Sequence, residues 1–157
     1  IRHTTVTHPA LFTVAESRHF RSQSPGAHTK NLFLRDKKAA VYLVVAEADA
    51  VIDLKGLHRR LGASGRFSFG SEGLMMELLG VRPGSVTPFG VINDTQGRVT
   101  VVLDAAMMEH PVLNYHPLDN TMTTTLSRDG LIRFLESTGH TPRIEAVSGG
   151  ITPTLDD

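Results

Sequence analysis

Three short polar clusters in the sequence carry groups that could bind an anion or polarise a carbonyl. They are residues 28–31, 83–88 and 116–121, and each adjoins a run of β-favouring or apolar residues. A lysine ammonium, side-chain amides and backbone N–H donors can together hold a phosphate or ribose and stabilise a developing oxyanion. Each cluster alone is also typical of a strand end or a connecting loop, so it is their combination that indicates a ligand site.

Missing motifs exclude the commonest catalytic machinery. The chain has no cysteine, which removes disulfides, thiolate metal sites and a cysteine nucleophile. It has no Gly-x-x-x-x-Gly-Lys phosphate loop, no Gly-x-Gly-x-x-Gly after a strand and no Gly-x-Ser-x-Gly elbow. The eight histidines show no convincing metal spacing, so we expect neither a metal nor another cofactor.

Length and hydropathy predict one domain that does not enter a membrane. The 157 residues suffice for a single domain, residues 1–157, with its own core. No apolar run approaches the ~20 residues of a membrane span, and no segment resembles a signal peptide. We therefore expect a cytoplasmic protein. Since the first residue is Ile1, we expect the natural sequence to begin further upstream.

Charge is unevenly distributed although the formal net charge is zero. Up to Arg66 there are eleven Lys or Arg residues against five Asp or Glu, and from Phe67 onward five against eleven, which gives +6 and −6. The first part could therefore present a basic face to an anionic partner. The alternative is that the two parts mix in one fold and their charges cancel.

Periodicity predicts a β-hairpin directly after the first cluster. Residues 32–35 and 40–46 have strand character, and the connection between them is short and charged. Lys30 and Asn31 would then lie at the open end of the first strand, where side chains can meet a ligand. The hairpin is thus expected to present the first cluster to solvent.

Helix caps follow the hairpin. Asp53 is predicted to cap a helix that ends at Gly62. Residues 62–65 resemble the loop with which some RNA-binding modules clamp a backbone. The strand-like residues 66–69 that follow favour a helix end and turn instead. Similar N-cap signals predict helices after Thr13, Ser71, Asp104 and Ser127.

The remaining β-favouring segments complete an α+β pattern. Residues 91–92 and 99–103, on either side of a polar turn, predict a second hairpin, and residues 143–147 a last strand. Strands interspersed with short helices argue for an α+β fold with a mixed sheet. No internal repeat or linker indicates a domain boundary.

Three motifs together resemble one protein family. HTKNLFL at 28–34, PGSVTPFG at 83–90 and HPLDNT at 116–121 closely resemble the YbaK-type aminoacyl-tRNA deacylases. Within them the similarity is to free-standing relatives of the prolyl-tRNA synthetase editing domain, the ProX or PrdX group. It extends from about Thr7 to Val147, with the motifs in family order. It implies a compact fold with a mixed, mostly antiparallel, barrel-like sheet and short helices around it.

The resemblance also implies a reaction and a set of residues. The expected reaction is trans-editing: hydrolysis of the ester that joins alanine to the terminal ribose of tRNA(Pro). Lys30 matches the family's essential lysine, and Gly84 and Pro88 match its Gly-x-x-x-Pro loop. The expected catalytic residues are Lys30, Gly84, Ser85 and His116. The expected substrate-binding residues are Asn31, Leu32, Phe33, Thr87, Pro88, Phe89, Asn120 and Thr121, although the apolar ones could equally be core residues.

The partner implied by this reaction is the acceptor end of aminoacylated tRNA(Pro). The basic residues expected to contact the acceptor stem are Lys37, Lys38, Arg59, Arg60 and Arg66. Prolyl-tRNA synthetase is a further candidate partner, whereas neither DNA nor a membrane is expected. The alternatives are a deacylase for another mischarged tRNA such as cysteinyl-tRNA(Pro), and a non-catalytic module of the same fold that binds tRNA or an amino acid.

Overall fold

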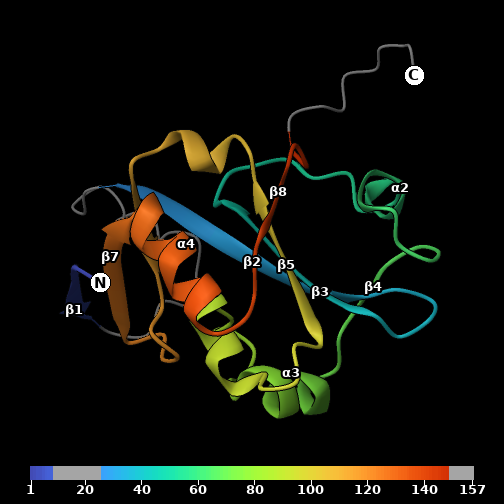
Figure 1. Ribbon diagram of the computed structural model, residues 1–157, viewed down its shortest axis with the longest axis horizontal. Coiled ribbons are helices and arrows are strands. Elements are labelled where there is room, and N and C mark those ends of the chain that lie inside the picture. Colours follow the sequence, from blue (N-terminus) through green and yellow to red (C-terminus); the bar gives the residue numbers. More distant parts are fainter. Residues whose placement is uncertain (9–25, 149–157) are drawn as a thin grey trace.

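The protein is described by a computed structural model over residues 1–8 and 26–148, and these residues form one mixed sheet with helices on both sides (Figure 1). The sheet has the strand order β1-β7-β6-β2-β3-β5-β8, with β4 paired to β2. Four strand pairs are antiparallel and three are parallel, which confirms the expected mixed α+β sheet. The strands are β1 (His3–Thr7), β2 (Ala27–Arg35), β3 (Val41–Glu47), β4 (Ser68–Phe69), β5 (Val99–Asp104), β6 (Val112–Tyr115), β7 (Met122–Ser127) and β8 (Arg143–Glu145).

The predicted first hairpin is present, but its first strand is longer than expected. β2 and β3 pair antiparallel in a register that runs from Thr29 opposite Glu47 to Arg35 opposite Val41. β2 already begins at Ala27, because its first residues also pair with β6. Lys30 therefore lies inside the strand, and its expected place at the open end was wrong.

The predicted second hairpin is wrong. Residues Pro88–Asn93 form a 3-10 helix, η1, and β5 joins the sheet by parallel pairing with β3 and β8. Thr87 starts η1 by accepting the N–H of Phe89, and Pro88 favours the first helical position because its missing N–H has no partner to lose there. Local capping thus outweighs the β-favouring side chains of residues 91–92.

Serine caps begin two of the helices as predicted. The Ser71 hydroxyl accepts the N–H of Leu74 at the start of α3 (Glu72–Leu79), and the Ser127 hydroxyl accepts that of Gly130 at the start of α4 (Arg128–Ser137). The helix expected after Thr13 lies outside the described residues.

The two aspartate caps are wrong. The helix predicted after Asp53 begins only at Leu57, as α2 (Leu57–Leu61) with Gly56 at its N-cap, although Gly62 ends it as predicted. The 3-10 helix η2 (Met107–Glu109) has no side-chain cap, because the Asp104 carboxylate instead accepts hydrogen bonds from the residues after β8.

Successive side chains of the central strands point to opposite faces of the sheet, and this alternation produces two hydrophobic cores, one on each face. Leu43 and Val45 contribute to the core shared with α3, η1 and α4, whereas Val44 contributes to the core shared with α2. Leu57 and Leu61 anchor α2 on that second face. Among residues 1–8 and 26–148 no helix is long and apolar enough to cross a membrane.

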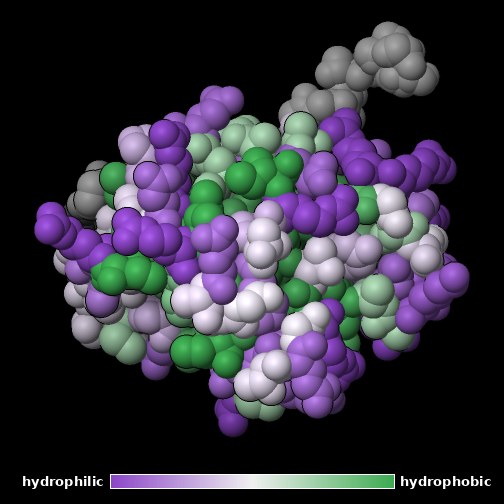
Figure 2. Space-filling model, in the orientation of Figure 1, coloured by the Kyte–Doolittle hydropathy of each residue, from purple (hydrophilic) through white to green (hydrophobic). Residues whose placement is uncertain are grey.

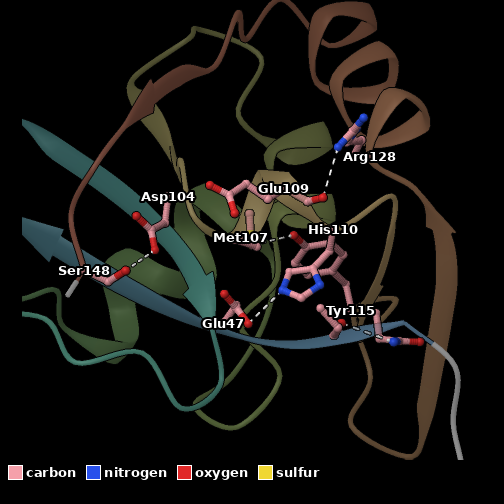
Figure 3. A network of polar contacts seen from close by, with 10 residues as sticks. Glu47, Asp104, Met107, Glu109, His110, Tyr115, Arg128 and Ser148 are labelled. Carbon is pink, nitrogen blue, oxygen red and sulfur yellow. Dashed lines mark hydrogen bonds and ion pairs between the residues drawn. The ribbon is translucent and has the colours of Figure 1, made fainter.

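The segment before β6 is held by contacts to two neighbouring elements, β3 and α4 (Figure 3). His110 Nε2 lies 2.9 Å from the Glu47 carboxylate at the end of β3. Arg128, at the start of α4, donates to the Met108 and Glu109 carbonyls. These contacts fix where β6 starts and hence the direction in which it leaves the sheet centre.

A buried hydrogen bond between two side chains joins the end of η1 to the segment after α4. His140 Nε2 lies 2.8 Å from Asp94 Oδ2, and the two side chains are only 2% and 1% exposed. The Asp94 carboxylate also accepts the N–H groups of Arg98 and Val99. Burial alone would raise the pKa of Asp94, but these hydrogen bonds lower it below its usual value.

We expect Asp94→Ala to lower the free energy of unfolding by about 3 kcal/mol, because removing one partner of a buried pair leaves the other unsatisfied. The exposed pair of Arg98 and Glu77 offers a matched control, and Glu77→Ala should cost less than about 1 kcal/mol. Urea denaturation at neutral pH measures both. Since the pKa of Asp94 is lowered on folding, its contribution should be lost as the pH falls through that lowered value. Equal stability of the two variants would contradict this account.

Candidate functional site

Among residues 1–8 and 26–148, the middle of β2 has a strand on one side only. β6 pairs with β2 only at Ala27 and His28, and β4 pairs only at Leu34 and Arg35. Residues 29–33, which we call the open stretch, pair with β3 on one side, and no described strand pairs with them on the other. The sheet therefore has an in-plane opening where β6 leaves β2.

Main-chain groups of Asn31 face this opening. The His28 carbonyl accepts the N–H of Ala48, on the β3 side, whereas the Phe33 carbonyl accepts the N–H of Gly70, on the β4 side. Because successive residues of a strand direct their polar groups to alternate sides, Asn31 shares the direction of Phe33. Its N–H and C=O thus point away from β3, into the opening.

Lys30 and Asn31 place their side chains on opposite faces of the sheet. The Lys30 side chain lies on the same face of the sheet as Leu32, the side covered by α2, and its Nζ donates to the Ala50 carbonyl at 2.5 Å. Asn31 lies on the same face as Phe33, toward η1, and its Oδ1 is buried with no hydrogen-bond partner in the described structure. Since the opening lies in the plane of the sheet, side chains from both faces can border it.

His116 directly follows β6, on the far side of the opening. Its Nδ1 lies 2.9 Å from the Met122 carbonyl. A carbonyl only accepts, so Nδ1 must carry the proton, and Nε2 of the neutral ring is then an acceptor. Nearby, the Thr121 hydroxyl and N–H donate to the Asp119 carboxylate and lower its pKa. His116 is thus an oriented proton acceptor beside a carboxylate.

The second and third clusters meet at Gly84. This glycine has a φ of +93°, and a Cβ added to it would lie 3.7 Å from Asn120 Nδ2. The Ser85 amide donates to the Arg82 carbonyl at 3.0 Å. This bond makes the Ser85 N–H unavailable for an oxyanion in this conformation, which argues against Ser85 as one of the donors that stabilise the developing oxyanion.

Most of the apolar residues expected to bind substrate belong to the two cores. Phe33 is 3% exposed, and Pro88 is also buried. Phe89 packs its ring against Tyr115 at 5.8 Å and against Phe134 at 5.2 Å. Burial raises the pKa of Tyr115, so this residue stays a neutral phenol that donates to Met107. Phe33 and Pro88 therefore pack behind the site, whereas Phe89 and Leu32 are only partly buried and keep some exposed surface.

A buried carboxylate organises the loops that carry the basic residues. Asp36 accepts the N–H groups of Lys38 and Ala40 in the β2–β3 turn and that of Ser64 after α2. The Lys37 N–H also donates to the Ser64 carbonyl. Burial alone would raise the pKa of Asp36, but the N–H donors of Ser64, Ala40 and Lys38 lower it. The turn and the loop are therefore joined at neutral pH.

This joint gathers the expected tRNA contacts at one end of the molecule, near α2 and the β2–β3 turn (Figure 1). Hydrophilic side chains cover much of that end in the space-filling view (Figure 2). Arg60 also donates to the Ala146 carbonyl at 2.6 Å. We call this set, whose members are all exposed, the basic surface: Lys37, Lys38, Arg59, Arg60 and Arg66.

Sequence reasoning missed the carbonyls that orient the polar side chains. Ala50 and Met122 contribute only main-chain oxygens, so their residue types carry no signal. The pair of Glu47 and His110 was also missed, because its members lie 63 positions apart in the chain. In the described part of the chain, no group of three or more His, Asp or Glu side chains could hold a metal ion.

Known proteins resemble this chain over most of its length. Residues 8–134 match the aminoacyl-tRNA editing domain family. The prolyl-tRNA synthetase associated domain-containing protein 1 of Danio rerio is 42% identical over 146 residues, which cover 92% of this chain and 79% of the relative. The prolyl-tRNA editing protein ProX of Acetoanaerobium sticklandii is 37% identical over 142 residues, 90% of this chain and 86% of the relative.

The fold also matches solved structures. One of them, a protein proposed to be a trans-editing enzyme for prolyl-tRNA synthetase, superposes with a TM-score of 0.72 at 20% identity, covering 94% of this chain and 87% of the other. At this identity the likeness concerns the fold alone. The sequence match over residues 8–134 is the decisive one: the chain belongs to the aminoacyl-tRNA editing domain family.

Proposed function

We propose that this protein is a trans-editing deacylase that hydrolyses alanyl-tRNA(Pro). The proposal rests on its family and on one feature of the fold, the opening between β2 and β6. In this proposal Asn31 of β2 and His116, which follows the β6 residues paired with β2, border the opening, and the loop of Gly84, which adjoins Asn120, forms one of its walls. The similarity to a prolyl-tRNA editing protein favours tRNA(Pro) as the carrier.

In the proposed reaction, water attacks the ester carbonyl carbon, the bond from that carbon to the ribose oxygen breaks, and the proton taken from the water passes to the ribose oxygen. Nε2 of His116 is oriented to accept the proton of the water, because Nδ1 is committed to the Met122 carbonyl. The Lys30 ammonium has three N–H donors, and its bond to Ala50 uses one. The others can hold the terminal adenosine or the ester oxygen. The Gly84 amide, in a loop with little side-chain bulk, would receive the developing oxyanion.

Selectivity for alanine over proline would follow from size. A small pocket excludes a larger side chain by overlap, as an editing site does. The surrounding wall is stiff, since Phe89 is packed between two other rings and Phe33 is buried. A stiff wall discriminates better than a mobile one, because a mobile wall can move aside to admit the larger residue.

Lys30→Ala should slow hydrolysis of alanyl-tRNA(Pro) by about 10²–10³-fold in single-turnover assays, since it removes the only positive charge that we place at the opening. Lys55→Ala, which removes an exposed lysine, is the matched control and should keep the wild-type rate. Circular dichroism would show that both variants fold. Retention of the wild-type rate by Lys30→Ala would overturn the assignment of Lys30.

A panel of esters separates the proposed substrate from its rivals. Alanyl-tRNA(Pro) should be hydrolysed much faster than prolyl-tRNA(Pro) or cysteinyl-tRNA(Pro). Faster hydrolysis of the cysteinyl ester would mean that the substrate is cysteinyl-tRNA(Pro) and not alanyl-tRNA(Pro). Binding of tRNA without release of any amino acid would mean that the protein is a non-catalytic tRNA-binding module and not a deacylase.

Binding of tRNA(Pro) should weaken with salt if the basic surface binds phosphates. Removing one phosphate-binding side chain should reduce the slope of log K against log salt by about 0.7–0.9. We expect the double variant Lys37→Ala with Lys38→Ala, which removes two such side chains, to reduce the slope by about 1.4–1.8 in fluorescence anisotropy titrations. Arg133→Ala removes an exposed charge on α4 and should leave the slope unchanged. Equal slopes for wild type and the double variant would exclude these two lysines from the tRNA interface.

A further inference from the structure

We propose that Thr29 is a positioning residue, whose hydroxyl ties β2 to β6 and so sets the separation between Lys30 and His116. This inference rests on the proposed deacylase function, which assigns one of these two groups to each strand. Thr29 itself contacts neither the ester nor the attacking water. It acts on the rate through the two residues that do.

The tie is a single hydrogen bond at the point where the two strands part. The Thr29 hydroxyl donates to the main-chain carbonyl of Asn114 at 2.6 Å, a normal length for a bond between two oxygens. β6 pairs with β2 at two positions, and the second of them joins His28 to Asn114. The hydroxyl therefore extends the link between the strands by one residue of β2, to the edge of the opening.

Asn114 is a suitable anchor because its own side chain is fixed. The residue is only 3% exposed. Its Nδ2 donates to the Ala27 carbonyl at 3.2 Å, and its Oδ1 accepts the Thr125 hydroxyl at 2.5 Å. A hydrogen bond can hold a strand in place only if the acceptor does not move. These contacts hold the acceptor of Thr29 against β2 and β7 together.

The bond also gives the shortest connection between the two groups of the proposed reaction. Lys30 directly follows Thr29, and His116 lies two residues after Asn114. Each of the two side chains is oriented by a carbonyl in its own part of the chain. What remains to be set is the distance between the strands that carry them. A displacement of about 1 Å between reacting groups can slow a reaction about 10²-fold.

The experiment compares two substitutions of Thr29. Thr29→Val keeps the branched shape and the strand preference but removes the hydroxyl, whereas Thr29→Ser keeps the hydroxyl. With alanyl-tRNA(Pro) and saturating protein, the single-turnover rate should fall about ten- to hundredfold in Thr29→Val and stay near the wild-type value in Thr29→Ser. The protein concentration that gives half the maximal rate should not change in either variant.

Thr100→Val is the matched control, because it removes another partly buried hydroxyl, on β5. It should keep the wild-type rate. Circular dichroism would show that the variants fold. If Thr29→Val does not fold, Thr29→Ala takes its place, with the same loss of rate expected.

A second background separates positioning from a general loosening of the fold. When His116→Ala has already removed the proton acceptor, Thr29→Val should lose most of its effect, because residues that act as a unit are strongly non-additive. The same factor of slowing in both backgrounds would overturn the inference. So would a wild-type rate in Thr29→Val, or a Thr29→Ser variant as slow as Thr29→Val.

Failure of the deacylase function would be seen separately, as a wild type that hydrolyses no ester. Amide hydrogen exchange then tests the tie between the strands directly. The main-chain amides of residues 113–116 should exchange faster in Thr29→Val than in the wild type or Thr29→Ser, because the end of β6 opens more often without the bond. Equal exchange in all three proteins would overturn the inference.

Discussion

The account depends on an interruption in the hydrogen-bond ladder of one strand. β2 is paired with β3 along most of its length, but in the described part of the chain its other side is paired only at the two ends, by β6 and by β4. Pairing along the whole of β2 would satisfy the Asn31 main chain within the sheet and leave no room for a ligand. The interruption therefore converts a structural strand into one edge of a site.

Several distant contacts keep the interruption open. His110 and Arg128 fix the segment before β6, so that β6 diverges from β2 after its second paired residue. At the other end of β2, Asp36 joins the β2–β3 turn to the loop after α2. The two ends of β2 are thus anchored independently, one toward the proposed reaction centre and the other at the basic surface.

Local signals predicted much of this fold, and pairing between distant strands decided the rest. Ser71 and Ser127 begin helices as predicted, because capping depends on residues within three positions. The extent of β2 and the parallel pairing of β5 could not be predicted in this way, since each depends on strands far away in sequence. Motif order identified the polar clusters, but not the carbonyls of Ala50 and Met122 that orient them, because every residue type has such a carbonyl.

The central claim is that ester hydrolysis occurs at the opening, with the Gly84 loop as one of its walls. Gly84→Ala and Gly97→Ala provide the most direct test, because both glycines have positive φ, +93° and +66°. Only Gly84 adjoins Asn120, whereas a Cβ at Gly97 would meet nothing within 4 Å. The account predicts that single-turnover hydrolysis of alanyl-tRNA(Pro) falls at least about tenfold in Gly84→Ala and is unchanged in Gly97→Ala. Equal rates in the two variants would contradict it.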